Sequence, residues 1–144
     1  MKIKDCMCNS ICYCRPYTTI GEVAKTMSKN HVGCIPVCDD TNNLVGIVTD
    51  RDIVLRAVAN NKDNNTKISE IMSTDTISCE ANSELVDVSK TMRKEQIRRI
   101  PVTEKGVLVG MLTLGDLAKN VQVNNEFVGF TTECICSSND KNAE

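Results

Sequence analysis

The sequence predicts an α+β fold in which two copies of one unit pack together with pseudo-twofold symmetry. Two observations support this prediction. Ile-Pro-Val occurs at 35–37 and again at 100–102, and each time an apolar run follows that ends in Thr-x-x-Asp, at 49–52 and at 113–116. The order of elements in each copy is roughly β-α-β-β-α, and a single copy would leave one face of its sheet exposed. An internal repeat of this kind determines the architecture.

The repeat also sets the domain boundaries. We expect copy one at 1–62, a linker at 63–67, copy two at 68–122 and a C-terminal segment at 123–144. The linker contains no apolar residue. The C-terminal segment holds both phenylalanines of the chain, Phe127 and Phe130, which we expect to dock on another surface, and its polar end is expected to be disordered.

The first helix of each copy follows from apolar residues at helical spacing. These residues are Ile20, Val23, Ala24 and Met27 in copy one and Leu85, Val88, Ser89 and Met92 in copy two. Thr19 and Glu22 predict a capping box at the start of the first of these helices. Ser83 is the expected N-cap of the second.

A hairpin and a second helix complete each copy. Short apolar runs at 34–38 and 44–49 flank a polar turn, and the corresponding turn in copy two is 104–106. The following helix is expected to start at Asp50 in copy one and near Leu114 in copy two. The apolar residues at helical spacing are Ile53, Val54, Ala57 and Val58 in copy one and Leu117, Ala118 and Val121 in copy two.

The composition is that of a globular protein, with 41% apolar and 25% charged residues. A formal net charge of -2 gives no electrostatic reason to expect nucleic acid or an anionic membrane as partner. No apolar run approaches the roughly 20 residues that span a bilayer, and the first residues lack the apolar stretch of a secretory signal. We therefore expect a cytoplasmic protein whose nine cysteines are reduced.

Thr-x-x-Asp at a helix start has two interpretations. One is a plain helix start, in which Thr caps the helix and Asp interacts with its dipole. The other is a ligand site, because a carboxylate held at this position presents two acceptor oxygens to hydrogen-bond donors of a ligand. The duplication of the motif, each time directly after a strand, favours the ligand site. The cap would then hold the ligand-binding carboxylate in place.

These motifs resemble those of a tandem pair of CBS domains (a Bateman module), over residues 1 to about 120. The resemblance rests on the two Ile-Pro-Val runs and on Val-Gly-hydrophobic-hydrophobic-Thr-x-x-Asp at 45–52 and 109–116. It implies a non-catalytic sensor that binds adenosyl-containing ligands in clefts between the two copies. AMP, ADP, ATP, S-adenosylmethionine and NAD all carry the adenosyl group. Such a nucleotide would be a regulatory ligand, and no obligatory cofactor is implied.

The resemblance also implies roles for particular residues. The ribose would be held by Thr49 with Asp52 and by Thr113 with Asp116. Basic residues just before the Ile-Pro pair, here Arg98 and Arg99, would reach phosphates, although as charged residues before a strand they can equally be surface charges. The cleft wall would include Ile35, Pro36, Ile100 and Pro101. Copy one has Gly33-Cys34 in place of the two arginines, so we expect the two clefts to differ.

The N-terminal cysteines suggest an alternative function, a metal-binding or redox-sensing module. The residues concerned are Cys6, Cys8, Cys12 and Cys14. Thiolates bind zinc and iron–sulfur clusters, but this spacing matches neither a Cys-x-x-Cys knuckle nor a ferredoxin motif. Cys6 and Cys12 align with Ile71 and Ile77 of copy two, which favours packing in an apolar core.

Two further expectations concern chemistry and partners. The sequence has no Ser–His or His–Cys arrangement at useful spacing and no Gly-rich phosphate loop, so we do not expect an enzyme. Because no effector domain is attached, we expect the module to act on a partner, on a dimer interface or on another chain. Apolar helix faces left over after the two copies have packed predict a homodimer with helices against helices around a twofold axis.

Overall fold

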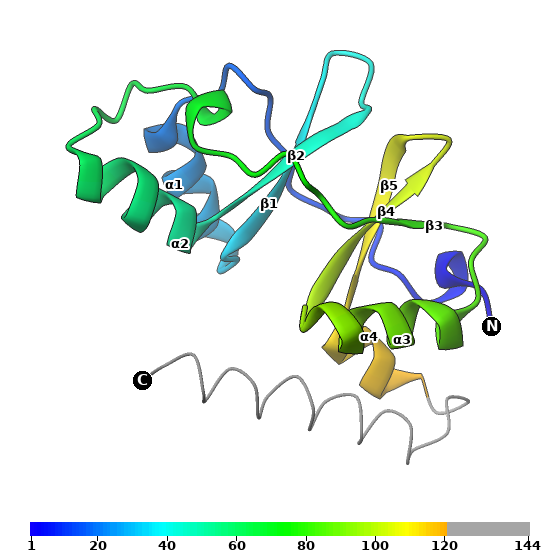
Figure 1. Cartoon of the computed structure of the whole chain (residues 1–144). Coiled ribbons are helices and arrows are strands. Elements are labelled where there is room, and N and C mark those ends of the chain that lie inside the picture. Colours follow the sequence, from blue (N-terminus) through cyan, green and yellow to red (C-terminus); the bar gives the residue numbers. More distant parts are fainter. Residues whose placement is uncertain (121–144) are drawn as a thin grey trace, which may run out of the picture. The chain divides into compact units, whose positions relative to one another are not determined.

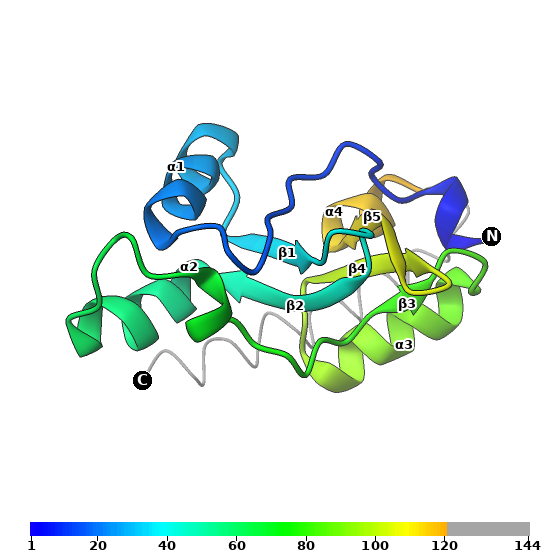
Figure 2. The same cartoon turned by 90° about the horizontal axis from the view of Figure 1, so that it is seen from above.

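The computed structural model describes residues 1–120. These residues form two compact units. The copy-one unit comprises Cys12–Thr76 and Gly106–Leu108, and the copy-two unit comprises Met1–Ile11, Ile77–Lys105 and the chain from Val109 onward. The elements of each unit can be followed in Figures 1 and 2. Helices and strands occur in both units, which confirms the predicted α+β class.

The copy-one unit begins with helix α1 (Ile20–Asn30) and a hairpin. The predicted capping box is present: the Glu22 amide donates to Thr19 Oγ1 at 3.3 Å, and the Thr19 amide donates to Glu22 Oε2 at 2.9 Å. Of the four predicted apolar residues of α1, Ile20, Val23 and Met27 are buried, whereas Ala24 is exposed. Strand β1 (Cys34–Cys38) pairs antiparallel with β2 (Leu44–Thr49).

The second helix of copy one departs from the predicted pattern. It begins as α2 (Asp50–Asp52), continues as a π-helical stretch over Ile53–Ala57, and ends in a 3-10 turn over Val58–Asn60. A π-helical turn contains more residues than an α-helical turn, so spacing based on 3.6 residues no longer identifies the buried face. Ala57 is buried, but Val54, Leu55 and Val58 are 55%, 50% and 65% exposed.

The copy-two unit has a three-stranded sheet in the order β3-β4-β5. Strand β3 (Cys79–Glu80) runs parallel to β4 (Arg99–Glu104), which is followed by β5 (Val107–Thr113) and helix α4 (Leu114–Lys119). Helix α3 (Leu85–Glu95) buries all four predicted residues. Every helix described is too short or too polar to cross a bilayer.

The prediction that Ser83 caps α3 is wrong. The N-cap is Glu84, and its side chain makes no capping hydrogen bond. The reason is that the N-terminus of the chain lies at this helix start. The Leu85 amide donates to the Met1 carbonyl at 2.9 Å, and the Glu84 carboxylate pairs with the Lys2 Nζ at 2.5 Å.

Each unit builds its core from both sequence copies. Ile3 is fully buried in the copy-two unit with Met92, Ile100 and Leu112, while Ile68 is fully buried in the copy-one unit with Val23, Ile35 and Val48. The segments that carry these two isoleucines are equivalent, since each starts with a 3-10 turn, Ile3–Asp5 or Ile68–Glu70. The beginning of each copy therefore packs on the hairpin of the other copy.

Two glycines allow this packing. A Cβ atom on Gly110 would lie 2.5 Å from Met7 Sδ, and one on Gly46 would lie 2.9 Å from Met72 Sδ. Backbone bonds hold both segments close: the Cys8 amide donates to the Met111 carbonyl, and the Ser73 amide to the Ile47 carbonyl, each at 2.9 Å. These glycines belong to the repeated Val-Gly motif, so the motif has a packing role as well.

Candidate functional site

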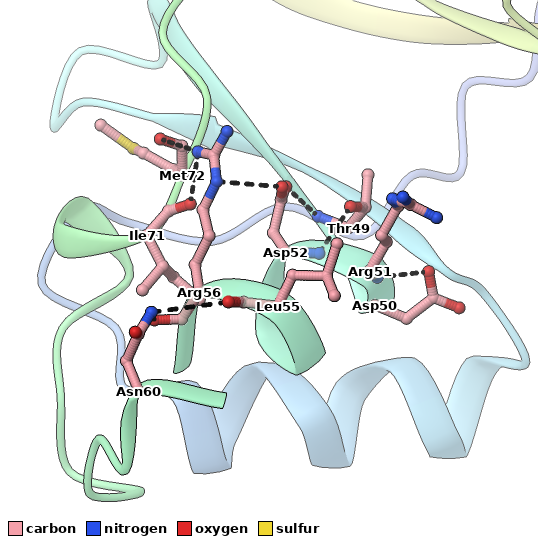
Figure 3. A network of polar contacts seen from close by, with 9 residues as sticks. All are labelled: Thr49, Asp50, Arg51, Asp52, Leu55, Arg56, Asn60, Ile71 and Met72. Carbon is pink, nitrogen blue, oxygen red and sulfur yellow. Dashed lines mark hydrogen bonds and ion pairs between the residues drawn. The ribbon is translucent and has the colours of Figure 1, made fainter. Parts of the chain in front are cut away.

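The Thr-x-x-Asp motif of copy one lies where β2 turns into α2 (Figure 3). Thr49 is the N-cap residue, and its Oγ1 accepts a hydrogen bond from the Asp52 amide at 3.1 Å. Asp52 Oδ2 in turn accepts from the Thr49 amide at 2.9 Å. This reciprocal pair fixes the Asp52 carboxylate at the end of the strand. Its side chain is 14% exposed.

Copy two repeats this corner at the junction of β5 and α4. Thr113 caps the helix, and Asp116 Oδ2 accepts from both the amide and the hydroxyl of Thr113 at 2.8 Å. The Asp116 amide reaches Thr113 Oγ1 at 3.2 Å. The helix-start interpretation of Thr-x-x-Asp therefore holds in both copies. Because these bonds use Oδ2, the Oδ1 oxygen of each aspartate remains available to a hydroxyl donor.

The start of the first hairpin strand lies beside this corner in both copies. The Leu114 amide donates to the Arg98 carbonyl at 3.0 Å, and the equivalent Asp50 amide donates to the Gly33 carbonyl at 2.9 Å. Arg98 is exposed and Arg99 is partly exposed. The structure thus brings the backbone of the predicted phosphate-binding pair next to the helix start that carries Asp116.

Copy one has the opposite charge at this place. A Cβ atom on Gly33 would lie only 2.8 Å from Asp50 Oδ2, so the Asp50 carboxylate occupies the space next to the strand start. Copy two instead carries Arg98 at the position of Gly33 and Leu114 at that of Asp50. The expected difference between the two copies is therefore also a difference in local charge.

The four residues expected in the cleft wall are buried. Ile35 and Ile100 are 0% exposed and belong to the cores of their units, and Pro36 and Pro101 beside them are buried as well. Their packing holds each strand start in place. A hollow of about 370 Å³ adjoins the copy-one corner and is lined by Asp50 and Arg51 of the motif and by Val54 and Leu55 of the following helix.

Arg56 is a site residue that the sequence interpretation missed. Its Nε lies 3.7 Å from Asp52 Oδ1, and its Nη1 donates to the carbonyl oxygens of Ile71 and Met72 at 3.1 Å and 3.4 Å (Figure 3). The available signal was the i, i+4 spacing between Asp52 and Arg56 on a helix, which brings opposite charges together. The contacts with Ile71 and Met72 have no such local signal.

Among residues 1–120, no three His, Cys, Asp or Glu side chains lie close enough together to hold a metal ion. Cys6 and Cys8 belong to the copy-two unit, and Cys12 and Cys14 to the copy-one unit. Burial raises the pKa of Cys14 to about 12, with a further contribution from Cys38. Burial therefore favours the neutral thiol form of Cys14 at neutral pH.

Cys6 packs next to the copy-two corner. Burial raises the pKa of this thiol, and the negative charge of Asp116 raises it further. Its Sγ lies 3.4 Å from the Ile3 carbonyl oxygen, and the side chain packs against the core of the copy-two unit. Ile71, which aligns with Cys6, is buried in the copy-one core. Cys6 thus packs as an apolar residue, as the alignment favoured. For the other aligned pair the expectation is wrong, because Ile77 is 37% exposed and Cys12 is only partly buried.

Comparison with known proteins identifies two CBS domains in the chain, because the CBS domain family model matches residues 3–58 and 68–123. The CBS domain-containing protein YhcV of Bacillus subtilis is 42% identical over 137 residues, which cover 95% of this chain and 96% of that protein. Hypoxic response protein 1 of Mycobacterium tuberculosis is 33% identical over 122 residues, covering 84% of each chain.

Solved structures show the same fold. The crystal structure of Hypoxic Response Protein I with two coordinated zinc ions has a TM-score of 0.77 at 30% identity and covers 84% of this chain and 99% of that one. The CBS domain pair of protein MJ0100, in complex with 5′-methylthioadenosine and S-adenosyl-L-methionine, has a TM-score of 0.71 at 28% identity. That match covers 83% of this chain and 94% of the other.

Proposed function

Because the chain belongs to the CBS domain family and contains a tandem pair of these domains, we propose that it is a non-catalytic regulatory module that binds adenosyl-containing ligands. The observation that carries the proposal is the duplicated corner, in which a capping box presents Asp52 in one unit and Asp116 in the other. The adenosyl ligands of the MJ0100 domain pair support the ligand class. The regulatory signal would pass to a partner protein.

The ribose would be bound at these corners. Its two adjacent hydroxyls would donate to the carboxylate oxygens of Asp52 or Asp116, and Thr49 or Thr113 would hold the carboxylate in place. In copy two, Arg98 and Arg99 would contact a phosphate group of the ligand, since Arg98 precedes β4, Arg99 is its first residue, and this strand starts beside the corner. The family match supports a sensor without chemistry of its own.

A thermal-shift screen tests the ligand class. AMP, adenosine or S-adenosylmethionine is expected to raise the melting temperature, because a ligand that binds only the folded state stabilises it by about 2.7 kcal/mol at 100 times its Kd. Zinc should leave the melt unchanged. Stabilisation by zinc together with protection of the thiols from alkylation, and none by adenosyl ligands, would instead support the cysteine-based function.

We also propose a homodimer that uses the exposed ridge formed by Val54, Leu55 and Val58. These side chains are at least half exposed, and their spacing places them on one side of the second helix. Two such ridges related by a twofold axis would bury one another. The equivalent positions of copy two within the described residues are Ala118 and Lys119, so the ridge is specific to copy one. Phe127 and Phe130 lie outside the described residues.

Leu55→Glu with Val58→Glu is expected to dissociate this dimer, since a charge buried in an apolar interface without a partner is strongly unfavourable. Analytical ultracentrifugation at micromolar concentration should find a dimer for the unmodified protein and a monomer for the variant. Val86→Glu is the matched control, because Val86 is 49% exposed on α3 and lies in the other unit. A monomeric unmodified protein, or a variant that stays dimeric, would contradict the proposed interface.

A further inference from the structure

We propose that Arg56 makes the copy-one corner selective for adenosyl ligands that carry phosphate, an inference that rests on the function proposed above. Sequence comparison of the two copies suggested that only copy two has a cation for a phosphate, because Gly33-Cys34 replaces Arg98-Arg99. The structure places a cation at the copy-one corner from another element, the helix that follows Asp52 (Figure 3).

Three oxygen atoms hold the guanidinium of Arg56. One is Asp52 Oδ1, 3.7 Å from Nε, and the other two are the carbonyl oxygens of Ile71 and Met72, which accept from Nη1. The segment that carries these carbonyls is itself fixed, because Ser73 forms a bridge with Ile47 of β2. Arg56 is therefore held in one orientation, which reduces the entropy lost when it binds a ligand.

The held guanidinium still has donors for a ligand. An arginine has five N–H groups, and the contacts above engage Nε and Nη1. Within residues 1–120, these contacts leave Nη2 for a ligand, and the side chain is 52% exposed. Arg56 Nε and Asp52 Oδ1 are 3.7 Å apart, so they form an ion pair but no short hydrogen bond. Asp52 Oδ1 can therefore still accept a hydrogen bond from a ribose hydroxyl.

Electrostatics then favours an anionic ligand. A phosphate on a ribose that is bound by Asp52 would lie within about one Debye length, about 8 Å at physiological ionic strength, of the guanidinium. The neighbouring side chains of Asp50 and Arg51 carry opposite charges, so together they add no net charge. Arg56 offsets the charge of Asp52, which would otherwise repel the phosphate.

Copy two has no arginine at the position equivalent to Arg56. Asn120 stands where copy one has Arg56, and its Nδ2 donates to the main-chain oxygen of Asp116 at 2.7 Å. Among the residues described, the Asp116 carboxylate forms no ion pair. The two copies thus place their cations on different elements, on the helix in copy one and before the strand in copy two.

The test is calorimetry with AMP and adenosine on an Asp116→Ala background, which leaves copy one as the binding site. Arg56→Gln should weaken AMP binding about tenfold, the lower end of what a hydrogen bond to a charged group contributes, and adenosine binding less than about twofold. Arg56→Lys should retain most of the AMP affinity, because it keeps the charge. The loss for AMP should become smaller at high salt.

Two further variants make the test specific. Lys25→Gln, on the same background, removes an exposed positive charge from α1 of the same unit and should leave the AMP-to-adenosine ratio unchanged. Asn120→Arg on an Asp52→Ala background should raise the preference for AMP at copy two. This second variant decides the question if Arg56→Gln does not fold.

Equal losses for AMP and adenosine in Arg56→Gln would overturn the inference, because they would show that Arg56 only tethers the Ile71–Met72 segment. No loss for either ligand, or an unchanged ratio in Asn120→Arg, would overturn it as well. If the unmodified protein binds neither AMP nor adenosine, the proposed function fails together with the inference. Binding of both ligands without discrimination by Arg56 would overturn the inference alone.

Discussion

Ile3→Ala and Ile68→Ala are each expected to lower the free energy of unfolding by about 2–5 kcal/mol, the range measured when a large buried aliphatic side chain is removed from a core. Both side chains are 0% exposed, and each lies in the hydrophobic core of one unit. The expected loss is large because each isoleucine attaches the beginning of one copy to the hairpin of the other. Urea denaturation followed by circular dichroism measures it.

Ile77→Ala is the matched control for these two variants. Ile77 is 37% exposed, so its removal should cost less than about 1 kcal/mol. If Ile3→Ala proved no more destabilising than Ile77→Ala, the N-terminal segment would not be packed in the core of the copy-two unit.

Asp116→Ala is expected to weaken the binding of any adenosyl ligand at copy two about tenfold to a hundredfold. The ribose hydroxyls lose a charged acceptor, and hydrogen bonds to charged groups contribute roughly 1.5–3 kcal/mol each. Calorimetry on an Asp52→Ala background isolates this corner. Asp116→Asn should have a smaller effect, because an amide oxygen can still accept one hydrogen bond and preserve the cap.

Asp116→Ala also removes half of the capping box at the start of α4, and a cap contributes about 0.5–2 kcal/mol to stability. A melting curve measured alongside the calorimetry separates the two effects. Asp87→Ala is a control for the loss of an exposed carboxylate in the same unit. A lower melting temperature with unchanged affinity would mean that Asp116 serves only as a helix-start residue.

Features that depend on neighbouring residues could be predicted from the sequence. The buried face of α3 and the capping box of α1 were predicted correctly, because helical spacing and cap chemistry act within one or two turns. The α+β class followed from the repeat. The cap at Ser83 was predicted wrongly, since the position of the N-terminus at this helix start is a long-range contact with no local signal.

The candidate site shows the same division. Thr49 and Asp52 could be identified because their spacing is that of a capping box and because the motif occurs again in copy two. Arg56 was missed because its role depends on the carbonyls of Ile71 and Met72, which are 15 and 16 residues away along the chain. The exposed ridge was missed because a π-helical stretch changes which residues of a helix face the core.

The most direct test of the account is the number of AMP molecules that each chain binds. Calorimetric titration of the unmodified protein should find two sites, Asp52→Ala and Asp116→Ala should each retain one, and the double variant should retain none. Melting curves of all four proteins establish that they are folded. A folded double variant that binds AMP as tightly as the unmodified protein would contradict the claim that the two Thr-x-x-Asp corners hold the ligand.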